Sequence, residues 1–319
     1  MKLNKKKFFL YLNKYLLTEK YPIIAVAVSG GPDSMALICL MSEWIKIKKG
    51  KIIALLIDHQ LRFESKSECK IIKNYLKRLN IESKIIKVSI KALNKKNMNE
   101  ARNNRYNKLI NYCKKNKILH LFIGHHHDDN LETFLIRKIA GSNLEGLGSM
   151  RFKVVRDKIQ IVRPLLNYNK NEILEYNKIN KIKFINDPSN NNTKYTRVFI
   201  RNYLNQKSHT RFIEKDFKNI SKFIHPYKIM IIEILNQIAF NIKKKHIVLS
   251  FEEFIKLDKL IKEKILEKIH NHLNNNRNIR ISKIRILLAE LNKNPLKRIN
   301  IASIIVSKNK NLLYFSVNH

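Results

Sequence analysis

Short apolar runs alternate with amphipathic stretches through the first 205 residues of the chain. Residues 23–28, IIAVAV, are small or β-branched and uncharged, which is typical of a strand buried on both faces. Further apolar runs begin near residues 51, 83 and 118, and the polar stretches 65–80 and 99–116 between them predict helices. Strands and helices alternating at this spacing predict an α/β fold with a doubly wound, mostly parallel sheet. Such sheets bind their ligands at the carboxyl ends of the strands.

The N-terminal segment has a helical pattern of its own. Phe8, Leu12, Tyr15 and Leu16 share one helical face, which predicts an amphipathic helix docked on the domain. The apolar run from Phe8 to Leu12 is too short for a secretory signal, and a weak organellar presequence is the alternative.

After residue 205 the pattern changes, which predicts a catalytic domain over residues 1–205 and a smaller, basic, mainly helical domain over residues 206–319. Ser250 and Glu253 form a capping-box pattern at the start of one long helix. The apolar face of this helix carries Leu257, Ile261, Ile265 and Ile269. Residues 299–317 predict a closing hairpin.

The chain is strongly basic, with 64 Lys and Arg against 25 Asp and Glu and a formal net charge of +39. A charge this large favours a polyanionic partner. We expect nucleic acid rather than a membrane, because the sequence has no lipidation motif and no apolar run long enough to span a bilayer.

The cysteines indicate a reducing compartment. Cys39, Cys69 and Cys113 are odd in number and widely spaced, and none forms a C-x-x-C pair. We therefore expect buried structural thiols in a cytoplasmic protein, or in one of an organellar matrix or stroma if an organelle encodes it.

The loop SGGPDS, residues 29–34, follows the first predicted strand and leads directly into a helix. Backbone N–H groups and the positive end of the helix dipole would meet there, which suits a phosphate. The loop lacks the lysine of a Walker loop and the spacing of a dinucleotide fingerprint. Asp33 would repel a triphosphate unless a divalent cation lay between them, so we infer bound magnesium. The alternative is a helix N-cap cluster with no ligand.

A second polar cluster lies in GHHHDDNLETFL, residues 124–135, after another predicted strand. His126, Asp129 and Glu132 are three apart, so consecutive members are neighbours on one helical face. An imidazole and two carboxylates there suit a magnesium or proton-transfer site. A zinc site is a weaker alternative, and helix capping with solvated histidines is the other.

These motifs resemble those of one superfamily. SGGPDS resembles the PP-loop of the ATP-pyrophosphatases, which adenylate a carbonyl or carboxyl oxygen and release pyrophosphate. His126, Asp129, Glu132 and Thr133 resemble the H-x-x-D-x-x-E-T motif of tRNA(Ile)-lysidine synthetases. Four further segments match that family in order over about residues 21–202: DHQLR at 58–62, EARNNRY at 100–106, RPLL at 163–166 and DPSNNNTKYTRVFIR at 187–201. Gln60 stands where the family has glycine, and Val198 where it usually has asparagine.

The resemblance implies a Rossmann-like PP-loop ATPase domain that uses ATP and magnesium. It implies that ATP activates the C2 carbonyl of the wobble cytidine in a CAU anticodon, and that the amine of free lysine then displaces AMP to give lysidine. Asp33 is the implied magnesium ligand and a catalytic residue, and the implied catalytic, lysine-facing residues are His126, Asp129 and Glu132. The implied ATP-binding residues are Ser29, Gly30, Gly31, Pro32, Asp33, Ser34 and Asp58.

Two arginine pairs suit contacts to RNA phosphates. Arg102 and Arg105 are three apart and Arg197 and Arg201 are four apart, so each pair shares a helical face. Tyr106 and Tyr195 lie beside them in sequence and suit stacking on an unpaired base. The alternative is that the arginines are solvated surface charges.

The expected partners are tRNA(Ile) with a CAU anticodon and free lysine, with no membrane partner and with a homodimer left open. The alternatives are a PP-loop tRNA thiolase and a tRNA-binding protein that has lost catalysis. A thiolase needs a thiol that carries persulfide or holds a cluster, and the spacing of the three cysteines does not favour it.

Overall fold

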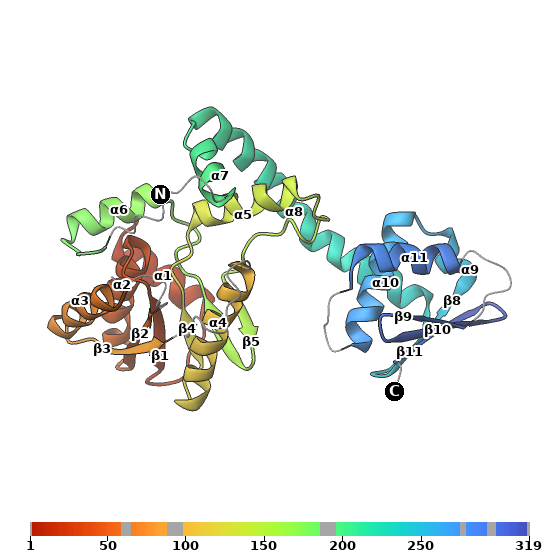
Figure 1. The fold of residues 1–319 in the computed structure, drawn as a ribbon, viewed down its shortest axis with the longest axis horizontal. Coiled ribbons are helices and arrows are strands. Elements are labelled where there is room, and N and C mark those ends of the chain that lie inside the picture. Colours follow the sequence, from red (N-terminus) through yellow and green to blue (C-terminus); the bar gives the residue numbers. More distant parts are fainter. Residues whose placement is uncertain are drawn as a thin grey trace. The chain divides into compact units, whose positions relative to one another are not determined.

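The computed structural model of the protein describes residues 2–58, 65–87, 98–185, 196–274, 279–291 and 298–317. The chain forms two compact units, Met1–Lys218 and Asn219–His319 (Figure 1). The predicted domain boundary at residue 205 lies just before helix α8 (Lys207–Ile238), whereas the units divide within that helix. The first turns of α8 belong to the first unit because they pack on α5 (His127–Ile139), where the Phe217 and Phe134 rings lie 5.4 Å apart.

The first unit is built on a six-stranded sheet, in which β5 alone runs antiparallel to its neighbour. In spatial order the strands are β3 (Glu82–Lys87), β2 (Lys51–Asp58), β1 (Ile23–Val28), β4 (His120–Phe122), β6 (Ile159–Val162) and β5 (Lys153–Arg156). The doubly wound, mostly parallel sheet predicted from the sequence is confirmed.

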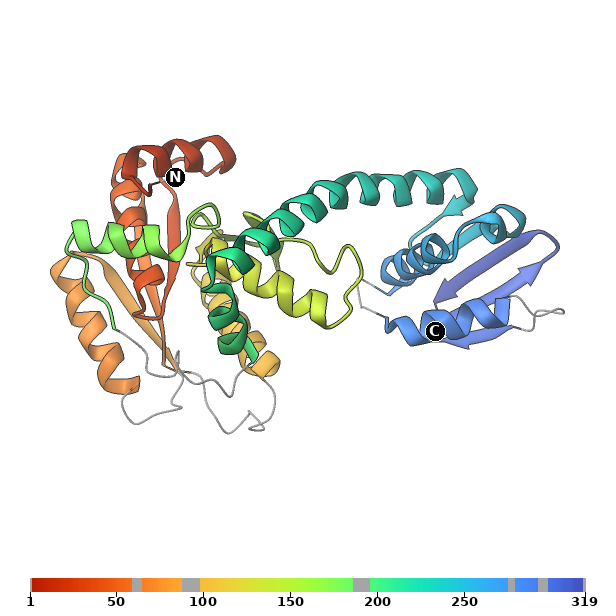
Figure 2. The same cartoon turned by 90° about the horizontal axis from the view of Figure 1, so that it is seen from above.

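Helices cover both faces of this sheet. Ile24, Val26 and Val28 of β1 enter one core while Ala25 enters the other, because successive side chains of a strand point to opposite faces. The first core is covered by α1 (Lys5–Tyr15), α2 (Pro32–Ile47), α3 (Ser65–Arg78) and α6 (Lys170–Ile179), and the second by α4 (Met98–Lys115) (Figure 2).

The N-terminal helix docks as its pattern predicts. Phe8, Leu12 and Leu16 are buried in the first core, while Tyr15, on the edge of the apolar face, stays 49% exposed. Asn4 caps the helix by accepting a hydrogen bond from the backbone N–H of Lys7.

The loop after β1 lies at the topological switch point of the sheet. β1 pairs with β2 on one side and β4 on the other, so the chain leaves β1 at the point where the strand order reverses, which is where open α/β sheets bind their ligands. Gly30 has φ +86°, a backbone conformation that favours glycine, and its carbonyl accepts a hydrogen bond from Ile185 N–H at 2.9 Å.

The second unit contains a five-stranded antiparallel sheet. Its strands in spatial order are β7 (Ala239–Ile242), β8 (His246–Ser250), β11 (Leu312–Val317), β10 (Ile304–Asn309) and β9 (Ile299–Ile301). The predicted closing hairpin is confirmed as β10 and β11, and the other three strands extend it into a sheet. Apolar side chains of α10 (Lys259–Leu273) and α11 (Ile281–Leu291) form a separate core with this sheet.

The prediction of one long helix from Ser250 is wrong, because two helices occupy that stretch. The Ser250 hydroxyl caps α9 (Phe251–Lys256), but Leu257 is extended and Asp258 begins α10 by accepting a hydrogen bond from Leu260 N–H. No helix in the described part of the chain is both long and apolar enough to cross a membrane.

Replacing Gly30 with alanine is expected to destabilise the first unit by roughly 2–4 kcal/mol, through left-handed strain and through crowding. A Cβ at this position would lie 2.1 Å from Ile72 Cδ1. Gly141→Ala is the matched control, because Gly141 also has positive φ but nothing lies within 4 Å of its Cβ position. The thermal unfolding midpoint is measured for both variants. Equal decreases in the midpoint would show that Ile72 moves away from the new Cβ at no cost in stability, which would contradict the prediction.

Candidate functional site

The loop between β1 and α2 holds its shape through its two serines. The Ser29 and Ser34 hydroxyl oxygens lie 3.2 Å apart, and the Ser34 hydroxyl donates to the Gly31 carbonyl at 3.0 Å. Gly31 is the N-cap of α2 and offers no side-chain cap. In the first turn, Pro32 has no backbone N–H, and the N–H groups of Asp33 and Ser34 are the ones that can bind an anion.

Gly124 lets the end of β4 lie directly against this loop. A Cβ at Gly124 would lie 3.2 Å from both the Asp33 carbonyl carbon and the Ser34 nitrogen. This close approach brings the next motif to the loop, and His126 Nε2 lies 3.9 Å from Asp33 Oδ1. Two motifs separated by more than ninety residues therefore form one site.

His126 and Asp129 form the start of α5. Asp129 Oδ2 accepts a hydrogen bond from the His126 backbone N–H at 3.0 Å and lies 3.6 Å from His126 Nε2. Asp129 thus caps the helix, as one interpretation of the sequence expected, and also faces the buried imidazole. The His126 Nδ1 atom is buried with no hydrogen-bond partner among the described residues.

Asp129 carries a negative charge in a buried setting. Burial alone would raise the pKa of its carboxyl, but His126, His125, the His126 backbone N–H and Arg197 lower it by more, so the pKa lies below its ordinary value. Asp129 is therefore an anion at neutral pH.

Glu132 is buried and binds both arginines of the second pair, Arg197 and Arg201. Its carboxylate accepts hydrogen bonds at 2.7 Å from Arg197 Nε and from Arg201 Nε, and Arg197 Nη2 lies 3.1 Å from Asp129 Oδ1. The hydrogen bond to Glu132 is also the main reason that the pKa of Arg201 is raised. Both arginines project from α7 (Thr196–Leu204) on one face, as predicted, and in this structure they bind carboxylates.

Lys170 belongs to the site although the sequence analysis did not select it. Its ammonium lies 2.7 Å from both carboxylate oxygens of Asp33. It is the first residue of α6, where a positive charge opposes the helix dipole, and this unfavourable position is the signal that could have found it. α6 also braces the loop, because Asn177 Nδ2 donates to the Pro32 carbonyl at 2.9 Å.

Three other residues of the predicted motifs, Asp58, Arg163 and Tyr106, are not part of the cluster around Asp33. Asp58 is buried at the carboxyl end of β2. Arg163 of the RPLL motif donates to His125 Nδ1 at 3.2 Å, beside the site. Tyr106 lies on the face of α4 that packs on the sheet, and it is only 7% exposed. The buried ring is not accessible to a base, so the predicted stacking is not supported.

Arg105 lies on α4, where its guanidinium is 6.0 Å from the Tyr106 ring centre. The Arg102 side chain, Gln60 and Tyr195 lie outside the described residues. Val198 is buried and apolar, so it cannot make the hydrogen bond of an asparagine side chain.

The fold and the loop define the class of protein. The chain belongs to the PP-loop family, whose domain model matches residues 4–208. It is 41% identical over 186 residues to the tRNA(Ile)-lysidine synthase of Orientia tsutsugamushi and 43% identical over 183 residues to that of Wolbachia pipientis wMel. These matches cover 58% and 57% of this chain, and the chain spans 42% of the length of either relative.

A solved structure has the same fold at low sequence identity. It is the U34-tRNA thiolase NcsA from Methanococcus maripaludis with its [4Fe-4S] cluster, with a TM-score of 0.58 and 18% identity. The similarity covers 69% of this chain and 79% of the thiolase, and it concerns the fold alone.

The lowered pKa of Asp129 predicts a pH-dependent contribution to stability. The carboxyl of the unfolded chain takes up a proton near pH 4, while the folded carboxyl stays ionised to lower pH. The contribution is therefore present above the unfolded pKa and lost as pH falls through the folded one. Thermal unfolding midpoints between pH 6 and pH 3 should fall less steeply for Asp129→Asn than for the parent. Asp157→Asn, in an exposed turn, is the control, and a parent-like slope in Asp129→Asn would contradict the prediction.

Proposed function

We propose that the protein ligates lysine to the wobble cytidine of a tRNA(Ile) with a CAU anticodon, at the expense of ATP. The observation that carries the proposal is the 3.9 Å approach of His126 to Asp33, which joins a PP-loop to an imidazole–carboxylate centre. The names of the two bacterial relatives support the same reaction.

The proposed reaction has two balanced steps. In the first, the C2 carbonyl oxygen of cytidine attacks the α-phosphorus of ATP and pyrophosphate leaves. In the second, an amine nitrogen of lysine attacks C2, AMP leaves with the former carbonyl oxygen, and the nitrogen loses a proton. Gly30, Gly31, Asp33 and Ser34 offer backbone N–H groups to phosphate, whereas Pro32 has none and the Ser29 N–H donates to the Ser34 hydroxyl. Asp129 faces the lysine amine, and His126 beside it accepts the proton that the nitrogen loses.

Glu132 has a different part in this proposal. Both of its oxygens already accept hydrogen bonds from arginines, so it holds Arg197 and Arg201 at the edge of the site. Each guanidinium keeps further N–H donors, and side chains that are 37% and 41% exposed can present them to RNA phosphates.

Magnesium fits this site as an ion carried by ATP. Asp33 is 24% exposed beside the loop, and its ion pair with the Lys170 ammonium supports a preference for a cation at this position. No group of three or more His, Cys, Asp or Glu residues suited to a metal occurs among the described residues. Phosphate oxygens and water would supply the remaining ligands, as magnesium commonly requires. When bound, the ion would neutralise charge on the pyrophosphate.

The cysteines argue against sulfur transfer. They lie on three different helices, α2, α3 and α4, and none forms the C-x-x-C spacing typical of a cluster or redox site. Burial raises the pKa of Cys39 and of Cys69 to about 11, and that of Cys113 to about 12. Thiols with such pKa values are poor nucleophiles at neutral pH.

The decisive assay incubates the protein with ATP, labelled lysine and unmodified tRNA(Ile). We expect lysine to enter the tRNA, with AMP formed in equal amount. A variant with all three cysteines changed to alanine should keep this activity, once a thermal melt shows that it is folded. Loss of activity in the folded variant would favour a thiolase, whereas tight tRNA binding with no AMP from the parent would favour a binding protein without catalysis.

Lys170 should control how ATP binding depends on magnesium. Without Lys170 the Asp33 carboxylate would face the triphosphate without the ammonium that contacts it, so Lys170→Met should weaken metal-free ATP binding at least about tenfold, the size of effect expected when a charged partner is removed. Magnesium should restore most of the affinity, whereas Asp33→Asn should make binding nearly insensitive to magnesium.

Calorimetric titration with ATP, with and without magnesium, measures these effects apart from turnover. Lys178→Met removes an exposed lysine of the same helix and is the matched control. Equal behaviour of Lys170→Met and Lys178→Met would show that the contact between Lys170 and Asp33 does not influence the nucleotide.

A further inference from the structure

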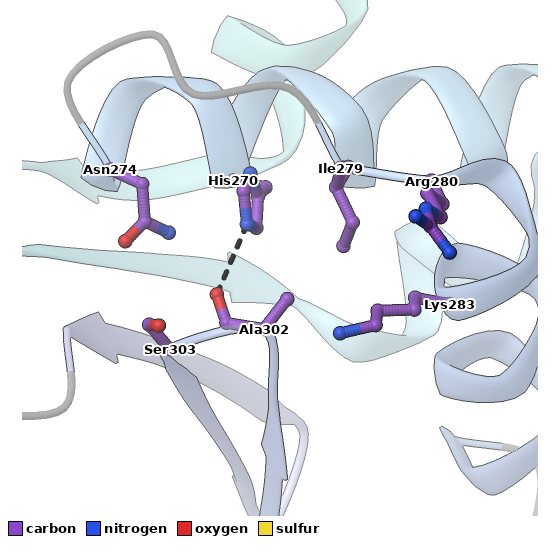
Figure 3. A pocket seen from close by; sticks show the side chains of 7 residues that line it. All are labelled: His270, Asn274, Ile279, Arg280, Lys283, Ala302 and Ser303. Carbon is purple, nitrogen blue, oxygen red and sulfur yellow. Dashed lines mark hydrogen bonds between the residues drawn. The ribbon is translucent and has the colours of Figure 1, made fainter. Parts of the chain in front are cut away.

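The second unit contains a polar cavity that plays no part in the proposed reaction. Its volume is about 480 Å³, and it lies between the C-terminal end of α10, the start of α11 and the turn from β9 to β10 (Figure 3). The lining residues are His270, Asn274, Ile279, Arg280, Lys283, Ala302 and Ser303. Cavities of this size accommodate small molecules or single units of a polymer.

The cavity has positive charge with no counter-charge. Arg280 and Lys283 make no ion pair or side-chain hydrogen bond among the described residues, and the lining contains no acidic side chain. Both cations also lie at the start of α11, where the helix dipole already has its positive end. An anion bound there would be attracted by the two side chains and by the dipole.

Buried donors in the lining also lack acceptors. Asn274 Nδ2 is buried with no hydrogen-bond partner among the described residues, and a buried amide N–H of this kind is costly unless a ligand or water accepts from it. His270 is 5% exposed, and its Nε2 lies 3.1 Å from the Ala302 carbonyl, which fixes the ring against the turn. Because Nε2 donates to that carbonyl, Nδ1 of the neutral ring is an acceptor, and it too has no hydrogen-bond partner among the described residues.

The donors surround one space. In Figure 3 the Lys283 side chain extends toward Ala302 from one end, and Asn274 and Ser303 lie at the other. Arg280 has a fork of N–H groups, Lys283 an ammonium, Asn274 an amide and Ser303 a hydroxyl, so the set offers many donors to an acceptor-rich group. A phosphate has more acceptor oxygens than a carboxylate, so it can accept hydrogen bonds from more of these donors at once.

We propose that this cavity is a phosphate-binding site that accepts one nucleotide unit, either as a free mononucleotide or as part of an RNA strand. The phosphate binds Arg280 and Lys283, and Asn274 Nδ2 donates to it. The remaining volume admits a sugar beside Ile279, the one apolar side chain of the lining apart from Ala302. The proposal concerns the second unit by itself and holds or fails independently of the ligation reaction.

The test follows the His270 ring signals by NMR in the full chain, with the ring labelled and the signals assigned by comparison with His270→Gln. Inorganic phosphate, AMP and a short single-stranded oligoribonucleotide are titrated in turn. The variant Arg280→Gln/Lys283→Gln removes two charges from the cavity. Lys244→Gln/Lys245→Gln removes two charges from an exposed turn of the same unit and is the matched control.

We expect the His270 signals to shift with a phosphate-bearing probe, the shift to be lost in Arg280→Gln/Lys283→Gln and to be kept in the control. A shift with AMP or inorganic phosphate would identify a free-ligand site, and a shift with the oligoribonucleotide alone would identify a backbone phosphate. No shift with any probe, or equal loss in both double variants, would overturn the proposal. The second result would show only a general response to net charge.

Discussion

Three carboxylates meet beyond the carboxyl ends of the central strands β1 and β4, and the structure depends on the cations that neutralise them. Asp33, Asp129 and Glu132 each contact a basic side chain, and Glu132 is almost wholly buried. A buried carboxylate with no partner would cost several kcal/mol, so the ion pairs are a condition of the fold at this end of the sheet. The cations come from far along the chain, 137 residues after Asp33 for Lys170 and 65 residues after Glu132 for Arg197. The site therefore forms only when α6 and α7 have docked.

The backbone provides the space in which these charges meet. Gly30 takes a left-handed conformation that turns the chain from β1 into α2, and Gly124 removes the side chain that would separate β4 from that turn. Because β1 and β4 are neighbouring parallel strands, the loop after β1 and the segment after β4 leave the sheet at the same end. The sheet order thus brings Asp33 to His126, and the ion pairs then hold the carboxylates in that arrangement.

Local patterns in the sequence predicted most of this framework, and long-range contacts account for the rest. The uncharged run of β1, the glycine turn and the apolar face of α1 follow from residues close together in the chain, and the structure confirms them. Lys170 was missed because its role depends on Asp33. The long helix predicted from Ser250 ends early because Asp258 offers a competing cap. Arg197 and Arg201 share a face as predicted, but the periodicity could not show that the face meets Glu132.

Two groups of basic side chains in the described part of the chain differ in what they contact, and dissolved salt affects the two groups differently. Lys170, Arg197 and Arg201 bind carboxylates at short range in a partly buried setting, where salt screens the attraction only weakly. Arg280 and Lys283 have no such partner among the described residues and face a cavity, so their field is available to a ligand and is more strongly screened. Dissolved salt therefore acts first on the unpaired cations, since the attraction of polyanions to basic surfaces falls steeply as salt rises. The paired cations keep the arrangement of Asp33, Asp129 and Glu132 under conditions in which the attraction for a polyanion has already weakened.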